Sequence, residues 1–335
     1  MQDKIIKIQS IDFQWPMEDP YLFCAHHRDI YPAGNDQQGI DKSVSNRPLG
    51  SDFTLKDGYR MYHGQIVPGF PAHPHRGFET VTIALEGLID HFDSLGAHGR
   101  YGNGDVQWLT TGKGCQHAEM FPLIYTDRDN VGELFQVWLN LPSKDKFADP
   151  SYKMLWSEDI PVIQEDGGKA QVKIIAGNYK GTQALAPNPA SWASNPVNHV
   201  GIFLVMLEPG AAVSFPAVSS TLNRNLYYYQ GTGLLDMEGT AIQPKSRVKL
   251  DGNQSITITN GSHPAWFIIL EGEPIQEPVA QYGPFVMNTH EEIQAAFNDY
   301  RRTEFGGWPW DRSDPVHERD AGRLARYVDG TEERR

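Results

Sequence analysis

Two short clusters of histidine and acidic side chains carry the clearest chemistry in this sequence. In the first, a single proline separates His73 from His75; in the second, a single alanine separates His117 from Glu119. Residues two positions apart in a β-strand point to the same face of a sheet, so each cluster directs both polar side chains toward one region. Two such pairs on neighbouring strands bring together three imidazoles and one carboxylate.

This donor set is typical of a metal centre. Three imidazoles and one carboxylate suit a borderline divalent metal such as iron, copper, manganese, nickel or cobalt, and leave positions open for water or substrate. A four-ligand zinc site is the alternative. The other interpretation is two unrelated surface pairs, since the chain has 12 histidines. Strand and glycine signals flank both clusters, and this context favours the metal centre.

Two further side chains near the clusters have alternative roles. Glu79 follows His75 by four residues and shares its strand face, so we expect it to orient a ligand or to pair with Arg76; direct ligation is the alternative. Cys115 precedes His117 by two and is expected to face the same interior as a small apolar filler, with a thiolate near the metal as the alternative.

The remaining histidines and the aromatic residues nearby are predicted to have minor roles. His26 and His27 either rim the cavity or lie in a loop, and His91 and His98 flank a loop and are expected at the surface. Four aromatic residues are candidates for the wall of a pocket, with core packing preferred for the two tryptophans: Phe70, Phe78, Trp108 and Trp138.

The elements that must position these residues are short strands. Segments 80–92, 101–114 and 134–141 each combine alternating apolar residues with glycine or proline turns, and strand signals resume between 170 and 270. Turns every 8–12 residues between alternating strands indicate an antiparallel sandwich or barrel. The predicted fold class is therefore all-β, with two tandem antiparallel barrels of jelly-roll type and a short C-terminal helix.

The division into domains is predicted to be sequential. A polar stretch after Pro142 suits a crossing between an N-terminal metal-binding barrel, 1–142, and a second barrel, 143–270. The last part, 271–335, contains a helix over 290–301, with an N-cap before it and an apolar stripe along it, and a charged tail that is expected to be mobile or at the surface.

Composition excludes several classes of partner. The formal net charge is −13, with 42 acidic and 29 basic residues, so no direct nucleic-acid or anionic-membrane contact is expected. No apolar run reaches the length of a membrane span, and the start lacks the apolar core of a signal peptide. We expect a reduced, cytoplasmic protein, in which a Cys24–Cys115 bridge is the less favoured alternative.

Several motifs together resemble one known family. Segments 73–82, 104–120, 138–142, 272–278 and 282–289 look like the signature of the pirins within the cupin superfamily, and the resemblance extends over roughly 15–310. It implies a bicupin, with a metal, most often iron, only in the N-terminal barrel. The family's ligands fall on His73, His75, His117 and Glu119, and the second barrel lacks a comparable His-x-His motif.

The resemblance also implies an activity. Some pirins resemble quercetin 2,3-dioxygenases, which open flavonol-type aromatic substrates with O₂ and release carbon monoxide. In such an enzyme Glu119 is the expected general base, taking the proton of a substrate hydroxyl. The alternative is a non-enzymatic, metal-binding regulatory protein that modulates a transcription factor or a metabolic enzyme by contact. The partners are therefore a small aromatic substrate and O₂ in the first case, and a protein in the second.

Overall fold

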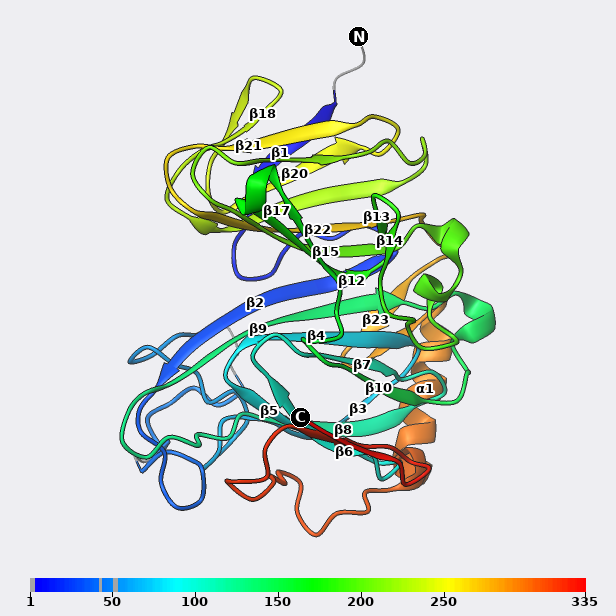
Figure 1. Ribbon diagram of the computed structural model, residues 1–335. Coiled ribbons are helices and arrows are strands. Elements are labelled where there is room, and N and C mark those ends of the chain that lie inside the picture. Colours follow the sequence, from blue (N-terminus) through cyan, green and yellow to red (C-terminus); the bar gives the residue numbers. More distant parts are fainter. Residues whose placement is uncertain (1–3, 42–43, 51–53) are drawn as a thin grey trace. The chain divides into compact units, whose positions relative to one another are not determined.

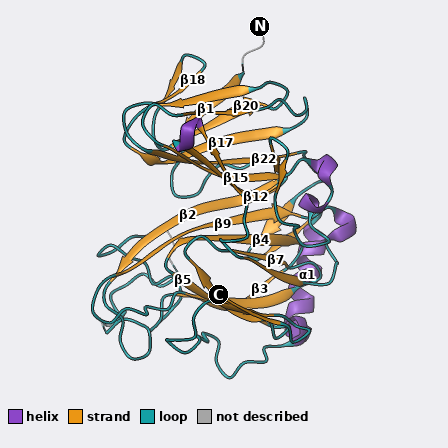
Figure 2. Ribbon diagram, viewed as in Figure 1, coloured by secondary structure: helices purple, strands orange, loops and turns teal. Residues whose placement is uncertain are grey.

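The computed structural model describes residues 4–41, 44–50 and 54–335 and consists mainly of strands (Figures 1 and 2). The chain forms two compact units. The unit with the histidine clusters, named the metal unit after the metal site predicted there, comprises Ala25–Ser157 and Glu277–Arg335, and the companion unit comprises Met1–Cys24 and Glu158–Gln276. The all-β fold class with two strand-built units and one short C-terminal helix is confirmed.

The metal unit contains two larger sheets. The five-stranded sheet has the order β10-β7-β4-β9-β2, and the six-stranded sheet has the order β26-β25-β6-β5-β8-β3. The bounds are β2 (Tyr21–Tyr31), β3 (Gly69–His75), β4 (Phe78–Glu86), β5 (Leu88–Asp93), β6 (His98–Gly102), β7 (Val106–Thr110), β8 (Cys115–Met120), β9 (Asn130–Asn140), β10 (Ser151–Leu155), β25 (Leu324–Arg326) and β26 (Glu332–Arg334). Pairs such as β4–β9 and β3–β8 are antiparallel.

The turn between β4 and β5 shows why glycine punctuates these strands. Gly87 has φ +84°, a backbone conformation that other residues rarely adopt. A Cβ added there would lie 2.4 Å from the carbonyl oxygen of Val131 on β9. A side chain at this position would therefore force the hairpin away from its neighbour.

The companion unit repeats the same class. Its seven-stranded sheet has the order β1-β20-β17-β22-β15-β12-β11, and its four-stranded sheet has the order β16-β21-β18-β19. The bounds are β1 (Ile5–Ser10), β11 (Val162–Glu165), β12 (Ala170–Ala176), β15 (Gly201–Leu207), β16 (Ala212–Phe215), β17 (Asn223–Gly231), β18 (Leu235–Met237), β19 (Thr240–Ile242), β20 (Ser246–Asp251), β21 (Ile256–Asn260) and β22 (Ala265–Gly272). Alternate side chains from both sheets form one apolar core, including Ile174, Phe203, Leu226 and Ile258.

The remaining elements are short. Two small hairpins are β13 (Asn178–Tyr179) with β14 (Thr182–Gln183), and β23 (Ala280–Tyr282) with β24 (Phe285–Met287). The single-turn 3₁₀ helices are η1 (Ser143–Asp145), η2 (Asp166–Gly168), η3 (Trp192–Ser194), η4 (Pro196–Asn198) and η5 (Glu304–Gly306). Helix α1 (His290–Thr303) begins with a capping box between Thr289 and Glu292. It ends two residues beyond the predicted end at residue 301.

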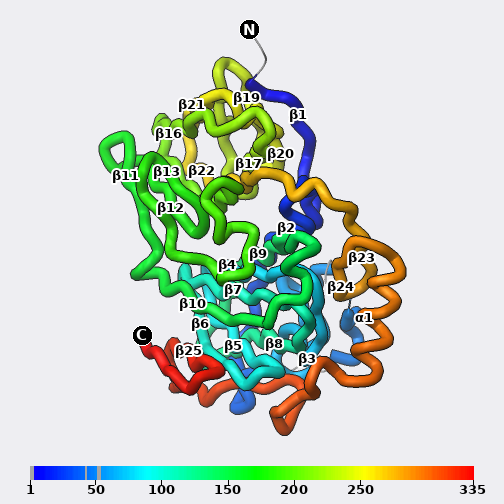
Figure 3. The backbone as a smooth tube through the Cα atoms, turned by 90° about the vertical axis from the view of Figure 1, so that its right-hand side faces the viewer, coloured from blue at the N-terminus to red at the C-terminus, as the bar shows by residue number. Residues whose placement is uncertain are grey.

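The two compact units do not follow the sequential division at residues 142 and 270. The chain's first strand, β1, pairs with β20 of the companion unit, whereas β25, near the end of the chain, pairs with β6 of the metal unit (Figure 3). The charged segment 311–335 is therefore not simply a mobile or surface tail, since Leu324 and Ala325 within it are buried. Pairing between such distant segments leaves no local signal in composition.

Among the described residues, no helix is long and apolar enough to cross a membrane.

Candidate metal centre

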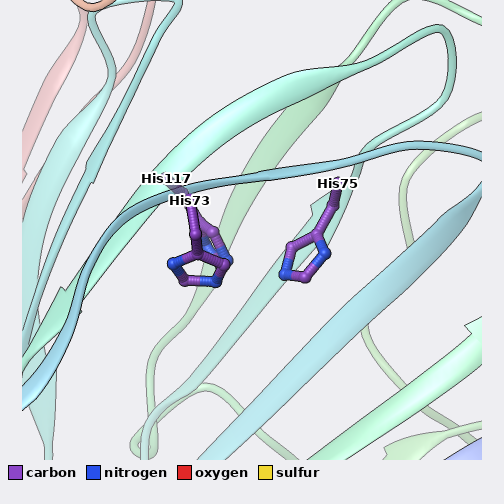
Figure 4. A group of neighbouring side chains, drawn as sticks. All are labelled: His73, His75 and His117. Carbon is purple, nitrogen blue, oxygen red and sulfur yellow. The ribbon is translucent and has the colours of Figure 1, made fainter. Parts of the chain in front are cut away.

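Strands β3 and β8 position the three histidines. They pair antiparallel, with His73 opposite His117 and His75 opposite Cys115. The three imidazoles project into the same space (Figure 4), and one candidate ligand atom from each lies within 4.8 Å of the other two. Within the part of the chain that the structure describes, this is the one group of three or more His, Cys, Asp or Glu side chains with that spacing.

Hydrogen bonds orient two of the rings. Nδ1 of His73 lies 2.9 Å from the carbonyl oxygen of Pro71, and Nδ1 of His75 lies 3.2 Å from that of Pro284. Because a carbonyl only accepts, Nδ1 carries the proton in each contact, and Nε2 of a neutral ring keeps its lone pair. Histidine ligands of metals are typically fixed in this way.

His117, unlike His73 and His75, has no hydrogen-bond partner among the described residues. It is fully buried, and both of its ring nitrogens lack such a partner. Buried polar atoms in folded proteins almost always have a partner, so an orphaned imidazole beside two others indicates that a further group binds here.

Burial also keeps the rings in the ligating form. Desolvation lowers the pKa of His73 to about 4 and the pKa values of His75 and His117 well below the ordinary value, with the neighbouring imidazoles adding to the effect. All three are therefore neutral at neutral pH, as metal binding requires. The residues present thus fit a divalent transition metal.

Glu119 lies next to the three histidines on β8. Its Oε2 is 3.9 Å from Nε2 of His117. Thr82 donates to Oε1 at 2.8 Å and Gln136 donates to Oε2 at 2.9 Å, while the Tyr101 hydroxyl is 3.5 Å from Oε1. Burial raises the pKa of the Glu119 carboxyl, and these donors oppose that shift. The carboxylate is therefore held beside the imidazoles by neutral donors.

Glu79 and Arg76 make other contacts. The buried Glu79 carboxylate accepts hydrogen bonds from Trp108 Nε1 at 3.0 Å and from Thr110 Oγ1 at 2.6 Å. Arg76 forms an ion pair with Asp299 on helix α1 at 3.0 Å. Glu79 thus bonds to the strand next to its own, and Arg76 ties the turn after His75 to the C-terminal helix.

Both cysteines are free and buried. Cys115 packs within an apolar cluster of the metal unit, as expected of a small filler, and burial raises the pKa of its thiol well above the ordinary value. The alternative of a Cys24–Cys115 disulfide is not what the structure has.

The prediction that His91 lies at the surface is wrong. Its side chain is completely buried, stacked on Tyr152 with ring centroids 4.8 Å apart, and its ring centroid is 5.6 Å from that of His117. Strand parity gives no signal for this burial, because residues on both faces of β5 are buried. The covering by β10, which contributes Tyr152, was not readable from local sequence.

The other histidines have ordinary partners. His98 is half-buried and lies 2.9 Å from His317 of the C-terminal segment. His26 contacts Glu133 at 2.7 Å, and the buried His27 contacts the Tyr62 hydroxyl at 3.0 Å. Desolvation lowers the pKa of His27 to about 3, so this ring is neutral.

Aromatic side chains surround the imidazoles. The rings of Phe78 and Trp138 have centroids 5.1 and 5.5 Å from that of His75, and Phe70 lies 6.2 Å from His73. Phe78 is fully buried, whereas Trp138 and Phe70 are partly exposed. Trp108 is fully buried and belongs to the core, as predicted.

Two strand-built units in one chain, one of them carrying a cluster of three neutral imidazoles on paired strands, define a bicupin of the cupin superfamily. Family models agree with this class in detail. Residues 34–139 match the model described as Pirin, and residues 202–306 match the Pirin C-terminal cupin domain. The chain belongs to the pirin family.

Individual relatives show the same affiliation. A Pseudomonas aeruginosa protein, named provisionally as a quercetin 2,3-dioxygenase, is 37% identical over 70% of this chain and 79% of its own length. Human pirin is 36% identical over 76% of this chain and 82% of its own. The crystal structure of a quercetin 2,3-dioxygenase from Acinetobacter baumannii superposes with a TM-score of 0.72 and 25% identity, covering 91% of this chain and 98% of that one.

Proposed function

We propose that this protein is a metal-dependent dioxygenase that opens flavonol-type aromatic substrates, such as quercetin, with O₂. The observation that carries the proposal is the close group of three neutral imidazoles, of which His75 and His117 are buried; among the described residues neither ring nitrogen of His117 has a hydrogen-bond partner. The names of the Pseudomonas and Acinetobacter relatives support this chemistry.

His73, His75 and His117 would hold the metal, with Glu119 as the fourth ligand. Iron is the first choice, and copper, manganese, nickel, cobalt and zinc fit the same donors. When bound, the metal acts as a Lewis acid that makes a substrate hydroxyl more acidic and brings substrate and O₂ together.

The chain's own residues supply the rest of the mechanism. Glu119 accepts the proton of the substrate hydroxyl, since its carboxylate is held next to the imidazoles by Thr82 and Gln136. Phe78 and Trp138 flank His75 and provide flat apolar surfaces against which an aromatic ring can pack. Burial of His75, His117 and Glu119 excludes bulk water from the reacting atoms.

The test is aerobic turnover of quercetin by purified protein loaded in turn with Fe²⁺, Cu²⁺, Mn²⁺, Ni²⁺ and Co²⁺. With at least one metal we expect loss of the flavonol absorbance, with equal amounts of O₂ consumed and carbon monoxide released. A His117→Ala protein taken through the same loading is the matched control for reaction in solution. Absence of turnover with all five metals would reject the proposal and favour a regulatory, partner-binding role.

A further inference from the structure

A fourth buried imidazole stands beside the three-histidine group. His91 lies on β5, directly opposite Glu119 of β8, and the next residue on the same face, Asp93, lies opposite His117. The side chains of His91 and Asp93 are both completely buried. They therefore adjoin the two site residues of β8 without belonging to the three-histidine group itself.

Asp93 is fixed by the backbone of the turn that follows it. Its Oδ1 accepts hydrogen bonds from the amides of Leu95 at 2.9 Å and Ala97 at 3.0 Å. Its Oδ2 lies 3.4 Å from Nε2 of His91. Since a carboxylate only accepts, the hydrogen in this contact belongs to Nε2, and in the tautomer that carries its one hydrogen there Nδ1 is an acceptor.

That second nitrogen has no partner within the described structure. Nδ1 of His91 is buried and makes no hydrogen bond to any described residue. The ring cannot easily turn to find one, because it is stacked on Tyr152 at an interplanar angle of 15°. A buried acceptor held in this way indicates a donor that arrives with a ligand.

We propose that His91, oriented by Asp93, binds the substrate through a hydrogen bond from a second hydroxyl, next to the oxygen held by the metal. This rests on the proposed function and specifies the substrate class as aromatic compounds that keep an O–H beside the chelating oxygen. His91 then acts as a specificity-determining residue, while His73, His75 and His117 remain the metal ligands.

Two chelating probes separate this role from metal binding. In the cobalt-loaded protein, 4-nitrocatechol bound as the monoanion retains one O–H, whereas bound tropolone retains none. The dissociation constant of each is measured by visible absorption in wild type and His91→Phe, which keeps an aromatic ring on Tyr152 but removes both nitrogens. Losing one hydrogen bond weakens 4-nitrocatechol about 3- to 10-fold and leaves tropolone within about twofold.

Two further variants complete the design. Asp93→Asn keeps the oxygen that accepts from Leu95 and Ala97 but presents an amide to Nε2, which makes Nδ1 a donor; we expect 4-nitrocatechol to bind more weakly, as in His91→Phe. His98→Phe is the matched control, since His98 stacks on Phe92, which points to the opposite face of β5 from His91. It should bind both probes as wild type does.

The outcomes are distinct. Equal affinity of wild type and His91→Phe for 4-nitrocatechol overturns the proposal, and so does an equal loss for both probes, which indicates a distorted pocket. Loss of cobalt from His91→Phe would show that His91 is a metal ligand. Failure of wild type to bind either probe would also reject the proposal. Since none of these measurements uses turnover, a failure of the dioxygenase proposal shows separately, as absence of quercetin oxidation.

Discussion

The buried cation of Lys146 offers a quantitative test of how the metal unit is held together. Its side chain is 1% exposed, and its Nζ donates to the carbonyl oxygens of Gly77 and Val286, at 2.8 and 3.2 Å, and to Asn140 Oδ1 at 2.8 Å. It thereby joins the turn after β3, the end of β9 and strand β24. Pro284, whose carbonyl orients His75, lies just before β24.

Burial lowers the pKa of Lys146 from 10.5 to about 8. Between these two values the unfolded chain binds more protons than the folded protein, so the free energy of unfolding must rise with pH in this window. A difference of roughly 2.5 pKa units corresponds to about 3 kcal/mol in total. Most of it, roughly 2.5 kcal/mol, is gained between pH 7 and pH 10, as the folded protein loses the buried charge.

The assay compares wild type with Lys146→Met, in which the titrating group is absent. Urea unfolding of both proteins, kept metal-free with a chelator, is measured at pH 7, 8.5 and 10. Buried tyrosines and cysteines also titrate at high pH, but they are common to both proteins and cancel in the difference. We expect the free energy of unfolding of wild type to rise by about 2 to 3 kcal/mol relative to that of Lys146→Met between pH 7 and pH 10. A difference that stays constant to within about 0.5 kcal/mol would refute the argument that the folded protein buries this charge.

Four further tests concern the site and its support. Glu119→Gln should bind the metal more weakly and lower quercetin turnover per bound metal by about 10²- to 10⁴-fold, since an amide cannot accept a proton. Equal rates per bound metal would leave Glu119 as a ligand only. His117→Ala should lose tight metal binding, measured by metal analysis, yet retain its circular dichroism, whereas full metal content would show that the site is misplaced. Chelation of the metal should lower Tm by several degrees, because the ion binds only the folded state; an unchanged Tm would contradict such coupling. Thr289→Ala should destabilise the metal unit by about 1 kcal/mol through loss of the α1 capping box, and an unchanged urea midpoint would contradict this.

Much of the candidate site was predictable because it depends on local periodicity. Side chains alternate along a strand, so the spacing of His73 and His75 and that of His117 and Glu119 fixes which of them share a face. Helix α1 was predictable for a similar reason, since its N-cap threonine and the glutamate three residues later are neighbours in the sequence.

The limits of this approach appear at Glu119 and Glu79. Spacing predicts that each carboxylate shares a strand face with a histidine, but the structure ends β3 at His75 and places Glu79 on β4, in the other sheet. Their hydrogen-bond partners separate their roles, because Glu79 bonds to Trp108 and Thr110 on β7, whereas Glu119 lies 3.9 Å from an orphaned nitrogen of His117. Such partners come from other strands and depend on the order of strands in each sheet.

The sequence by itself therefore determined the fold class, the C-terminal helix and the grouping of three histidines, all of which follow from patterns a few residues long. Only the tertiary structure decided that His91 is buried beside His117, that β1 joins the companion unit and that β25 joins the metal unit. The physical reason is that strands hundreds of residues apart pair through backbone hydrogen bonds, which depend little on the side chains. Which strands become neighbours is therefore decided by the packing of the whole sheet.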